Sequence, residues 1–125
     1  MAKHVLYVCK SCSFSLKERD YLGERGGKHL LDRVSDLAEN WVLKSDFAIE
    51  ELVCLSACKR PCAIALTGAN KTSLMFGDLS PLDSADAILQ LCDLYYTSTD
   101  GIIPRNERPE ILQKSILARI PPSPR

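Results

Sequence analysis

The stretch HVLYVCKSC, residues 4–12, joins a short apolar segment to a pair of cysteines. Residues 4–8 are aromatic or β-branched for the most part and carry apolar side chains on both faces, which is typical of a strand buried between two layers. Cys9 follows at the point where such a strand would end, and Cys12 comes three residues later. The stretch therefore predicts a buried strand with thiols at its carboxyl end.

The chain beyond this strand alternates between helical and extended patterns. Apolar residues recur at helical spacing over residues 28–43, which predicts a helix. Residues 47–55 read as a second strand that ends at another cysteine group. Residues 63–68 and 72–79, joined by a short polar turn, predict a β-hairpin. Residues 80–98 begin with a serine and a proline before a second apolar stripe, which predicts a second helix.

This order of elements predicts an α/β protein of thioredoxin-like fold, with a mixed four-stranded sheet and helices packed on it. The first β-α-β unit is expected to be parallel and right-handed. Residues 1–101 form the predicted domain, and residues 102–125 form a proline-rich C-terminal extension whose middle is expected to hold a short helix beginning at Pro109. Because parallel neighbours end at the same edge of a sheet, the two cysteine groups are expected to meet there.

Composition narrows the functional classes. The chain has 125 residues, 46% hydrophobic and 26% charged, with a formal net charge of +0. Such a balance is typical of a single globular domain and lacks the basic field of a nucleic-acid-binding protein. No apolar run is long enough for a signal peptide or a membrane span, so a cytoplasmic location and no membrane partner are expected. In a reducing compartment, six cysteines favour metal binding or thiol chemistry over structural disulfides.

The second cysteine group is CLSACKRPC, residues 54–62, with thiols at Cys54, Cys58 and Cys62. Four thiolates suit zinc or an iron–sulfur cluster. The Cys9–Cys12 spacing is narrow, whereas the second group is wider, and a two-iron cluster tolerates such spacings better than a single zinc ion. The predicted metal ligands are therefore Cys9, Cys12, Cys54 and Cys58, with Cys62 as the alternate ligand. No catalytic residue is predicted.

Two basic residues, Lys59 and Arg60, follow Cys58 directly. Positive charge near the sulfurs raises the reduction potential of a cluster, so both residues are predicted to support the cofactor without ligating it. The same charges suit docking of an acidic redox partner. Their alternative role is that of two solvated loop residues.

The remaining cysteine and the histidines have simpler interpretations. Cys92 lies in the apolar stripe of the predicted second helix, and a lone cysteine there is expected to pack in the core. His4 and His29, the only histidines, open a strand and a helix and are expected to be structural or exposed.

The cysteine pattern resembles that of the thioredoxin-like ferredoxins. The resemblance rests on Cys9 after an apolar segment and on CLSACKRP before an apolar strand. Members of that family bind one 2Fe–2S cluster through four cysteines, so the resemblance implies a cluster site and a fold for this chain, but not a cluster type. Cys54 and Cys58 match that pattern as Cys9 does, whereas Cys12 matches only as the nearest thiol. The chain departs from the ferredoxins in its short first spacing, in Ser56 where they carry a glycine, and in the additional Cys62.

From His4 to Pro122 the chain also resembles a bacterial family of uncharacterised, predicted metal-binding proteins. This resemblance rests on CKSC, on CLSACKRPCAIAL and on the ending ARIPP. Together, the two resemblances imply a ferredoxin-like electron carrier with an iron–sulfur cluster, 2Fe–2S being favoured, rather than an enzyme. Two alternatives stay open: a zinc-binding interaction module, and a thiol-disulfide oxidoreductase that uses Cys9 and Cys12 as its redox pair.

Overall fold

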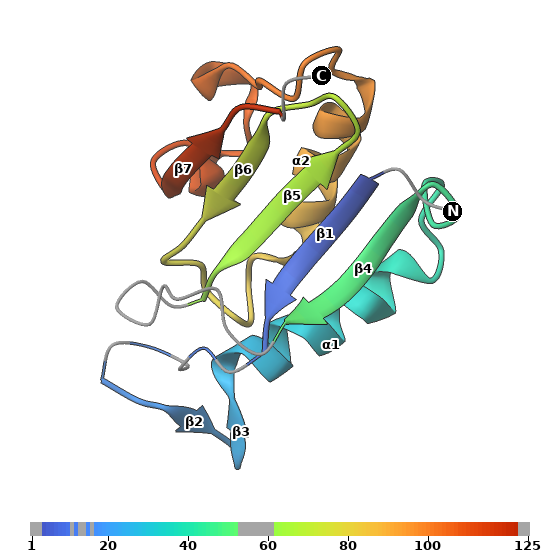
Figure 1. The fold of residues 1–125 in the computed structure, drawn as a ribbon. Helices are drawn as coiled ribbons and strands as arrows, with labels where there is room; N and C mark the ends of the chain where they lie inside the picture. The colour runs from blue at the N-terminus through green and yellow to red at the C-terminus, as the bar shows by residue number, and fades with distance from the viewer. Residues whose placement is uncertain (1–3, 11, 13–14, 16, 53–61, 123–125) are drawn as a thin grey trace.

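The computed structural model describes residues 4–10, 12, 15, 17–52 and 62–122 (Figure 1). Within them lie seven strands, two α-helices and two short 3-10 helices. In chain order they are β1 (His4–Cys9), β2 (Asp20–Tyr21), β3 (Glu24–Arg25), α1 (Gly26–Ala38), β4 (Phe47–Leu52), β5 (Ile64–Gly68), β6 (Ser73–Phe76), α2 (Ala85–Thr97), η1 (Arg105–Glu107), η2 (Glu110–Leu112) and β7 (Ile116–Ile120).

Five of the strands form one mixed sheet in the order β4-β1-β5-β6-β7. β1 and β4 are parallel, as predicted, and their register places Cys9 opposite Leu52. The β1–β5, β5–β6 and β6–β7 pairs are antiparallel. Both α-helices lie on the same face of this sheet, behind it in Figure 1, and contact each other. The α/β thioredoxin-like architecture predicted from the sequence is confirmed.

The sheet has one strand more than the four predicted. β7 comes from the proline-rich segment and pairs with β6, with Ser73 opposite Ile120. The predicted short helix is present as η2, which begins after Pro109. Residues 102–122 therefore contribute an edge strand to the sheet in addition to the predicted helical turn.

Helix α1 covers residues 26–38, earlier at both ends than the predicted range of 28–43. After Ala38 the chain turns, and the indole N–H of Trp41 donates a hydrogen bond to the Asp93 carboxylate in α2 at 2.9 Å. The Trp41 ring also lies 5.5 Å from the Phe47 ring, centroid to centroid. Trp41 thus fits the apolar spacing of the helix but is partly buried in the turn after α1, where it contacts α2 and the start of β4.

The core lies between the sheet and the two helices. Its largest fully buried side chains come from both helices, the central strands and η2: Tyr95, Phe76, Leu6, Leu30, Ile64, Leu66, Ile88, Leu91, Leu112, Val8 and Val34. Cys92 is completely buried in α2, as predicted. No helix among the described residues has the length and apolar character needed to cross a membrane.

Candidate metal centre

Cys9 occupies the carboxyl end of β1, where it is 2% exposed. Its N–H donates a hydrogen bond to the carbonyl oxygen of Ala63 at 3.1 Å, and the N–H of Lys10 donates to Leu52 at 2.9 Å. The backbone of Cys9 is therefore held between the end of β4 and the approach to β5. This is the edge of the sheet at which the sequence predicts a metal site.

The Cys12 side chain lies at the same end of the sheet as Cys9. It is 5% exposed and shares a hydrogen bond with the Cys9 thiol. Burial, and then this hydrogen bond, raise the pKa of the Cys12 thiol, and the neighbouring Cys62 adds to the increase. The CKSC segment thus turns its second thiol inward, against the first.

Cys62, the predicted alternate ligand, is completely buried just before β5. Burial, followed by the charge of neighbouring Cys9, raises the pKa of its thiol to about 12. Three thiols from two segments that are distant in the sequence therefore lie together at one end of the sheet. A cation that binds Cys12 and Cys62 has to displace their protons, because buried thiols with a raised pKa stay protonated at neutral pH.

The described thiols do not make a complete site by themselves. Within residues 4–10, 12, 15, 17–52 and 62–122, no group of three or more His, Cys, Asp or Glu side chains is arranged to hold a metal ion. The predicted ligands Cys54 and Cys58 lie outside the described residues, as do Lys59 and Arg60. The donor chemistry of the described thiols fits a thiolate-bound metal or cluster.

The start of α1 contacts the cysteine segment directly. The N–H of Gly27 donates a hydrogen bond to the carbonyl oxygen of Cys12 at 3.0 Å. Gly27 was not among the residues expected at the site, although two adjacent glycines before a helix are a sign of close backbone packing. The first turn of α1 therefore forms one wall of the candidate centre.

A two-stranded hairpin, β2–β3, connects the cysteine segment to α1. Its turn residues Leu22 and Gly23 both have positive φ angles, 53° and 84°. The hairpin is joined to α1 by a contact between the His29 ring and the carbonyl oxygen of Tyr21. The centroids of the Tyr21 and His29 rings lie 5.6 Å apart. His29 is thus a structural residue, as predicted. In Figure 1 the hairpin projects beyond the end of the sheet at which β1 ends.

The chain matches a known protein family. The profile of a family described as "Protein of unknown function (DUF1636)" matches residues 6–122. The chain belongs to the DUF1636 family. No curated protein matches it.

The fold of this DUF1636 chain is similar to that of solved iron–sulfur proteins. One is a thioredoxin-like [2Fe-2S] ferredoxin from Aquifex aeolicus, with a TM-score of 0.58 and 10% identity over 95% of this chain and 94% of the other. A cysteine-to-serine variant of that ferredoxin gives a TM-score of 0.58 and 10% identity over 92% and 98% of the two chains. The wild-type form of that ferredoxin gives a TM-score of 0.51 and 13% identity over 72% of this chain and 84% of the other. At these identities the likeness establishes the fold, in agreement with the resemblance seen in the sequence.

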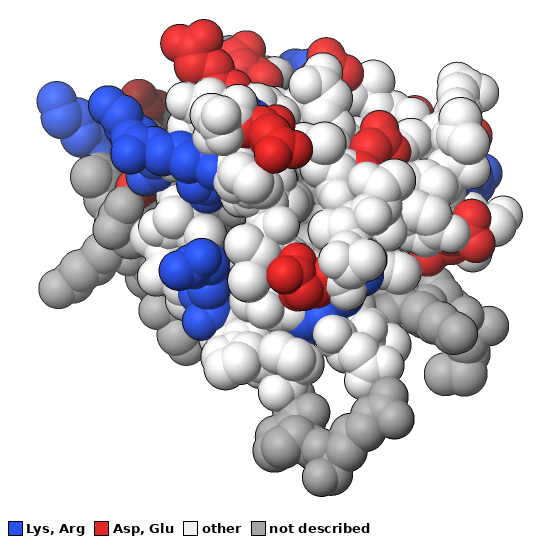
Figure 2. Space-filling model, turned by 90° about the horizontal axis from the view of Figure 1, so that it is seen from above, with Lys and Arg blue, Asp and Glu red and all other residues white. Residues whose placement is uncertain are grey.

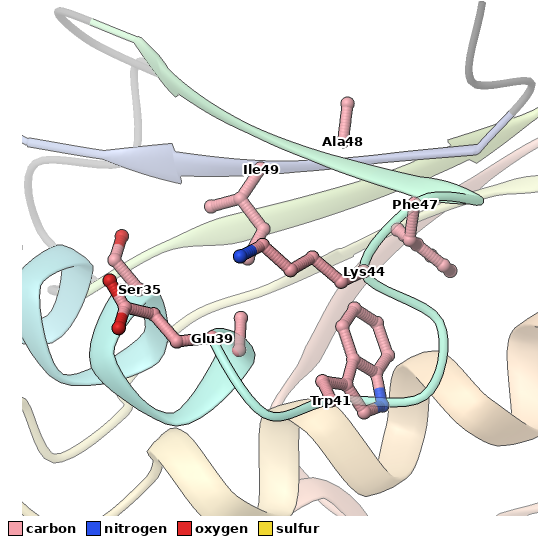
Figure 3. Close-up of a pocket in the computed structure, with 8 residues that line it drawn as sticks. Ser35, Glu39, Trp41, Lys44, Phe47, Ala48 and Ile49 are labelled. Carbon is pink, nitrogen blue, oxygen red and sulfur yellow. The ribbon is translucent and has the colours of Figure 1, made fainter.

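A separate pocket lies near the start of β4, away from the cysteines of this DUF1636 protein. It has a volume of about 310 Å³. Figure 3 shows the Trp41 ring and the Lys44 side chain lining it between α1 and β4, with Glu39 on the helix side. Its lining includes no cysteine, so the pocket is distinct from the candidate metal centre.

On the face drawn in Figure 2, the described residues show no broad field of one sign. Acidic side chains are scattered among uncharged ones, and several basic side chains gather at one side of this face. This mixture is what a chain with equal numbers of acidic and basic residues is expected to present.

Proposed function

We propose that this protein binds an iron–sulfur cluster, 2Fe–2S being favoured, and serves as a ferredoxin-like electron carrier. The observation that carries the proposal is the meeting of Cys9, Cys12 and Cys62 at the carboxyl end of β1. In the proposal Cys9 and Cys12 ligate the cluster together with Cys54 and Cys58, and Cys62 is the alternate ligand. The thioredoxin-like fold supports the proposal, since solved ferredoxins share it.

The chain's own residues supply a dry, thiol-rich site. Cys9, Cys12 and Cys62 are each 5% exposed or less, so water is largely excluded from their sulfur atoms. Excluding solvent and donating hydrogen bonds to the sulfurs are the means by which a protein tunes a cluster's reduction potential. A bound cluster would supply one-electron transfer at neutral pH.

The proposed partner is a redox protein with an acidic docking surface. This part of the proposal depends on Lys59 and Arg60, whose positive charges follow Cys58 in the sequence. Charge complementarity of this kind speeds the encounter of two proteins and weakens as salt is added.

A zinc-binding interaction module is the second candidate. It is favoured by the narrow Cys9–Cys12 spacing, with the two thiols in hydrogen-bond contact, because a single small ion needs ligands that are close together. Zinc would then hold the two cysteine segments together without redox chemistry.

Metal analysis of protein purified without oxygen separates these candidates. The electron-carrier proposal expects a coloured protein with iron and acid-labile sulfide in equal amounts, and the colour should bleach on reduction. Replacing Cys9 by Ala should remove most of the metal, whereas replacing the core residue Cys92 by Ala should retain it. Colourless protein with one zinc per chain would establish the second candidate. Metal-free protein with a reversible Cys9–Cys12 disulfide would favour a thiol-disulfide oxidoreductase and reject both.

A further inference from the structure

Gly27 lies where a side chain cannot fit. A Cβ atom at this position would lie 1.9 Å from the carbonyl oxygen of Cys9 and 2.8 Å from the carbonyl carbon of Lys10. Atoms of this kind make ordinary contact at about 3.5 Å, so the first turn of α1 and the end of β1 would have to separate by roughly 1.5 Å. Only glycine permits the approach seen here.

The same residue holds the other cysteine. The N–H of Gly27 donates to the carbonyl oxygen of Cys12 at 3.0 Å, while Cys9 is held by the sheet through its bond to Ala63. Gly27 thus contacts the backbone at both ends of the CKSC segment. Its position along α1 helps to set the separation of the two thiols.

We propose that Gly27 is a positioning residue for the metal centre. The inference rests on the proposed function and adds a residue to it. Metal–thiolate bonds have lengths of about 2.3 Å and tolerate errors of only about 0.2 Å. A displacement of the start of α1 that is several times larger moves Cys12 relative to Cys9 and weakens metal binding.

The alternative is that Gly27 matters only for packing. The clash of the added Cβ with the backbone of Cys9 and Lys10 would then lower the stability of the fold in Gly27→Ala, and the metal affinity of the folded protein would stay unchanged. Comparing metal binding with folding therefore separates the two roles.

The test compares Gly27→Ala with Gly68→Ala as a matched control. A Cβ at Gly68 would also be crowded, at 2.9 Å from the His4 ring, but His4 is at the opposite end of β1 from Cys9. Gly27→Ala should weaken the affinity for the bound metal or cluster by roughly 10–100-fold, the usual effect of residues that orient ligands. It should also shift the visible absorption of any cluster retained. Gly68→Ala should retain the wild-type affinity and spectrum even if its thermal stability falls.

Thiol labelling provides a readout that does not need metal. In metal-free protein, mass spectrometry should find faster alkylation of Cys12 in Gly27→Ala than in the wild type, and unchanged alkylation in Gly68→Ala. If wild-type protein binds no metal while this difference is seen, the proposed function fails, but Gly27 still sets the position of Cys12 relative to Cys9. If Gly27→Ala binds metal as tightly as the wild type and its Cys12 is alkylated at the wild-type rate, the inference is overturned.

Hydrogen exchange covers the case in which Gly27→Ala does not fold. Amides in the first turn of a helix have no partner within the helix and normally exchange quickly. The Gly27 amide of metal-free wild-type protein should instead exchange as slowly as the interior Val34 amide, because it is bonded to Cys12. Fast exchange at Gly27 would overturn the proposal.

Discussion

Cys62 and Leu79 exchange two backbone hydrogen bonds. The N–H of Cys62 donates to the carbonyl oxygen of Leu79 at 3.2 Å, and the N–H of Leu79 donates to the carbonyl oxygen of Cys62 at 3.3 Å. The pair extends the β5–β6 hairpin beyond its last paired residues, Ile64 and Phe76. The hairpin therefore holds the backbone of Cys62 in place next to Cys9.

This position predicts a ligand exchange at the second cysteine group. If Cys62 is the alternate ligand, Cys58→Ala should retain part of its metal because the Cys62 thiol takes the vacated position. A Cys58→Ala, Cys62→Ala double variant should retain roughly a tenth or less of the wild-type metal. Metal and sulfide per chain are measured after anaerobic purification, with Cys58→Ala, Cys92→Ala as the control. Equal metal content in the two double variants would rule out the alternate role of Cys62.

The β2–β3 turn predicts a stabilising substitution. Leu22 has a φ of 53° and is 82% exposed, so its side chain bears the cost of a left-handed conformation and buries little apolar surface. Leu22→Asn creates the Asn-Gly pair that two-residue hairpins prefer and should stabilise the hairpin by about 0.5–1 kcal/mol. Slower amide exchange in β3 is the measurement. Leu22→Ala, which shortens the side chain without favouring this conformation, should show a much smaller effect; equal slowing in both variants contradicts the explanation.

Replacing Lys71 is expected to destabilise the carboxyl end of α2. It is 9% exposed, and its Nζ donates to the carbonyl oxygens of Tyr95 at 2.7 Å and Tyr96 at 3.0 Å. These groups carry the negative end of the helix dipole. Lys71→Met preserves the stem but loses the charge and both bonds, so the free energy of unfolding should fall by about 1–2 kcal/mol.

Chemical denaturation measures this loss, with Lys28→Met as its control. The Lys28 side chain is about half exposed and pairs with Asp32 at 2.6 Å on the helix surface. Surface pairs contribute little, so its replacement should change the free energy of unfolding much less. Equal losses in the two variants would contradict the capping role of Lys71.

The buried hydroxyl of Tyr95 is expected to make the free energy of unfolding depend on pH. Burial raises the pKa of its hydroxyl to about 12, from an ordinary value of 10.0. Because the unfolded chain ionises first, the stability that the neutral hydroxyl contributes is complete below pH 10 and is lost as pH rises towards 12. The hydroxyl also donates to Thr72 at 2.7 Å.

Tyr95→Phe tests this linkage. At about pH 8 the variant should be less stable by about 1 kcal/mol, because the bond to Thr72 is lost. From about pH 8 to about pH 11 the difference should shrink by about 1 kcal/mol, since phenylalanine does not ionise. Denaturation curves across this range measure it. A difference that stays constant or grows with pH would show that the hydroxyl is not held neutral by burial.

Local patterns in the sequence were sufficient to predict most elements of the fold. The apolar run before Cys9 predicted β1, and the apolar stripe around Cys92 predicted α2. The boundaries were less exact. α1 ends at Ala38 because Trp41 is bonded to Asp93 in another helix, and no periodicity within one helix reveals such a bond.

Other features depended on contacts between distant parts of the chain. β7 was not predicted, because its short segment between prolines becomes a strand only by pairing with the edge of β6. The placement of Cys62 against Leu79 likewise depends on the hairpin.

The sequence by itself determined that this is an α/β protein with thiols at the end of its first strand, since periodicity and residue type act over a few neighbouring residues. Only the tertiary structure decided which described thiols meet and how closely α1 approaches them. The reason is physical: a close contact such as that of Gly27 with Cys9 is set by the packing of whole elements, and the sequence shows it only as a glycine.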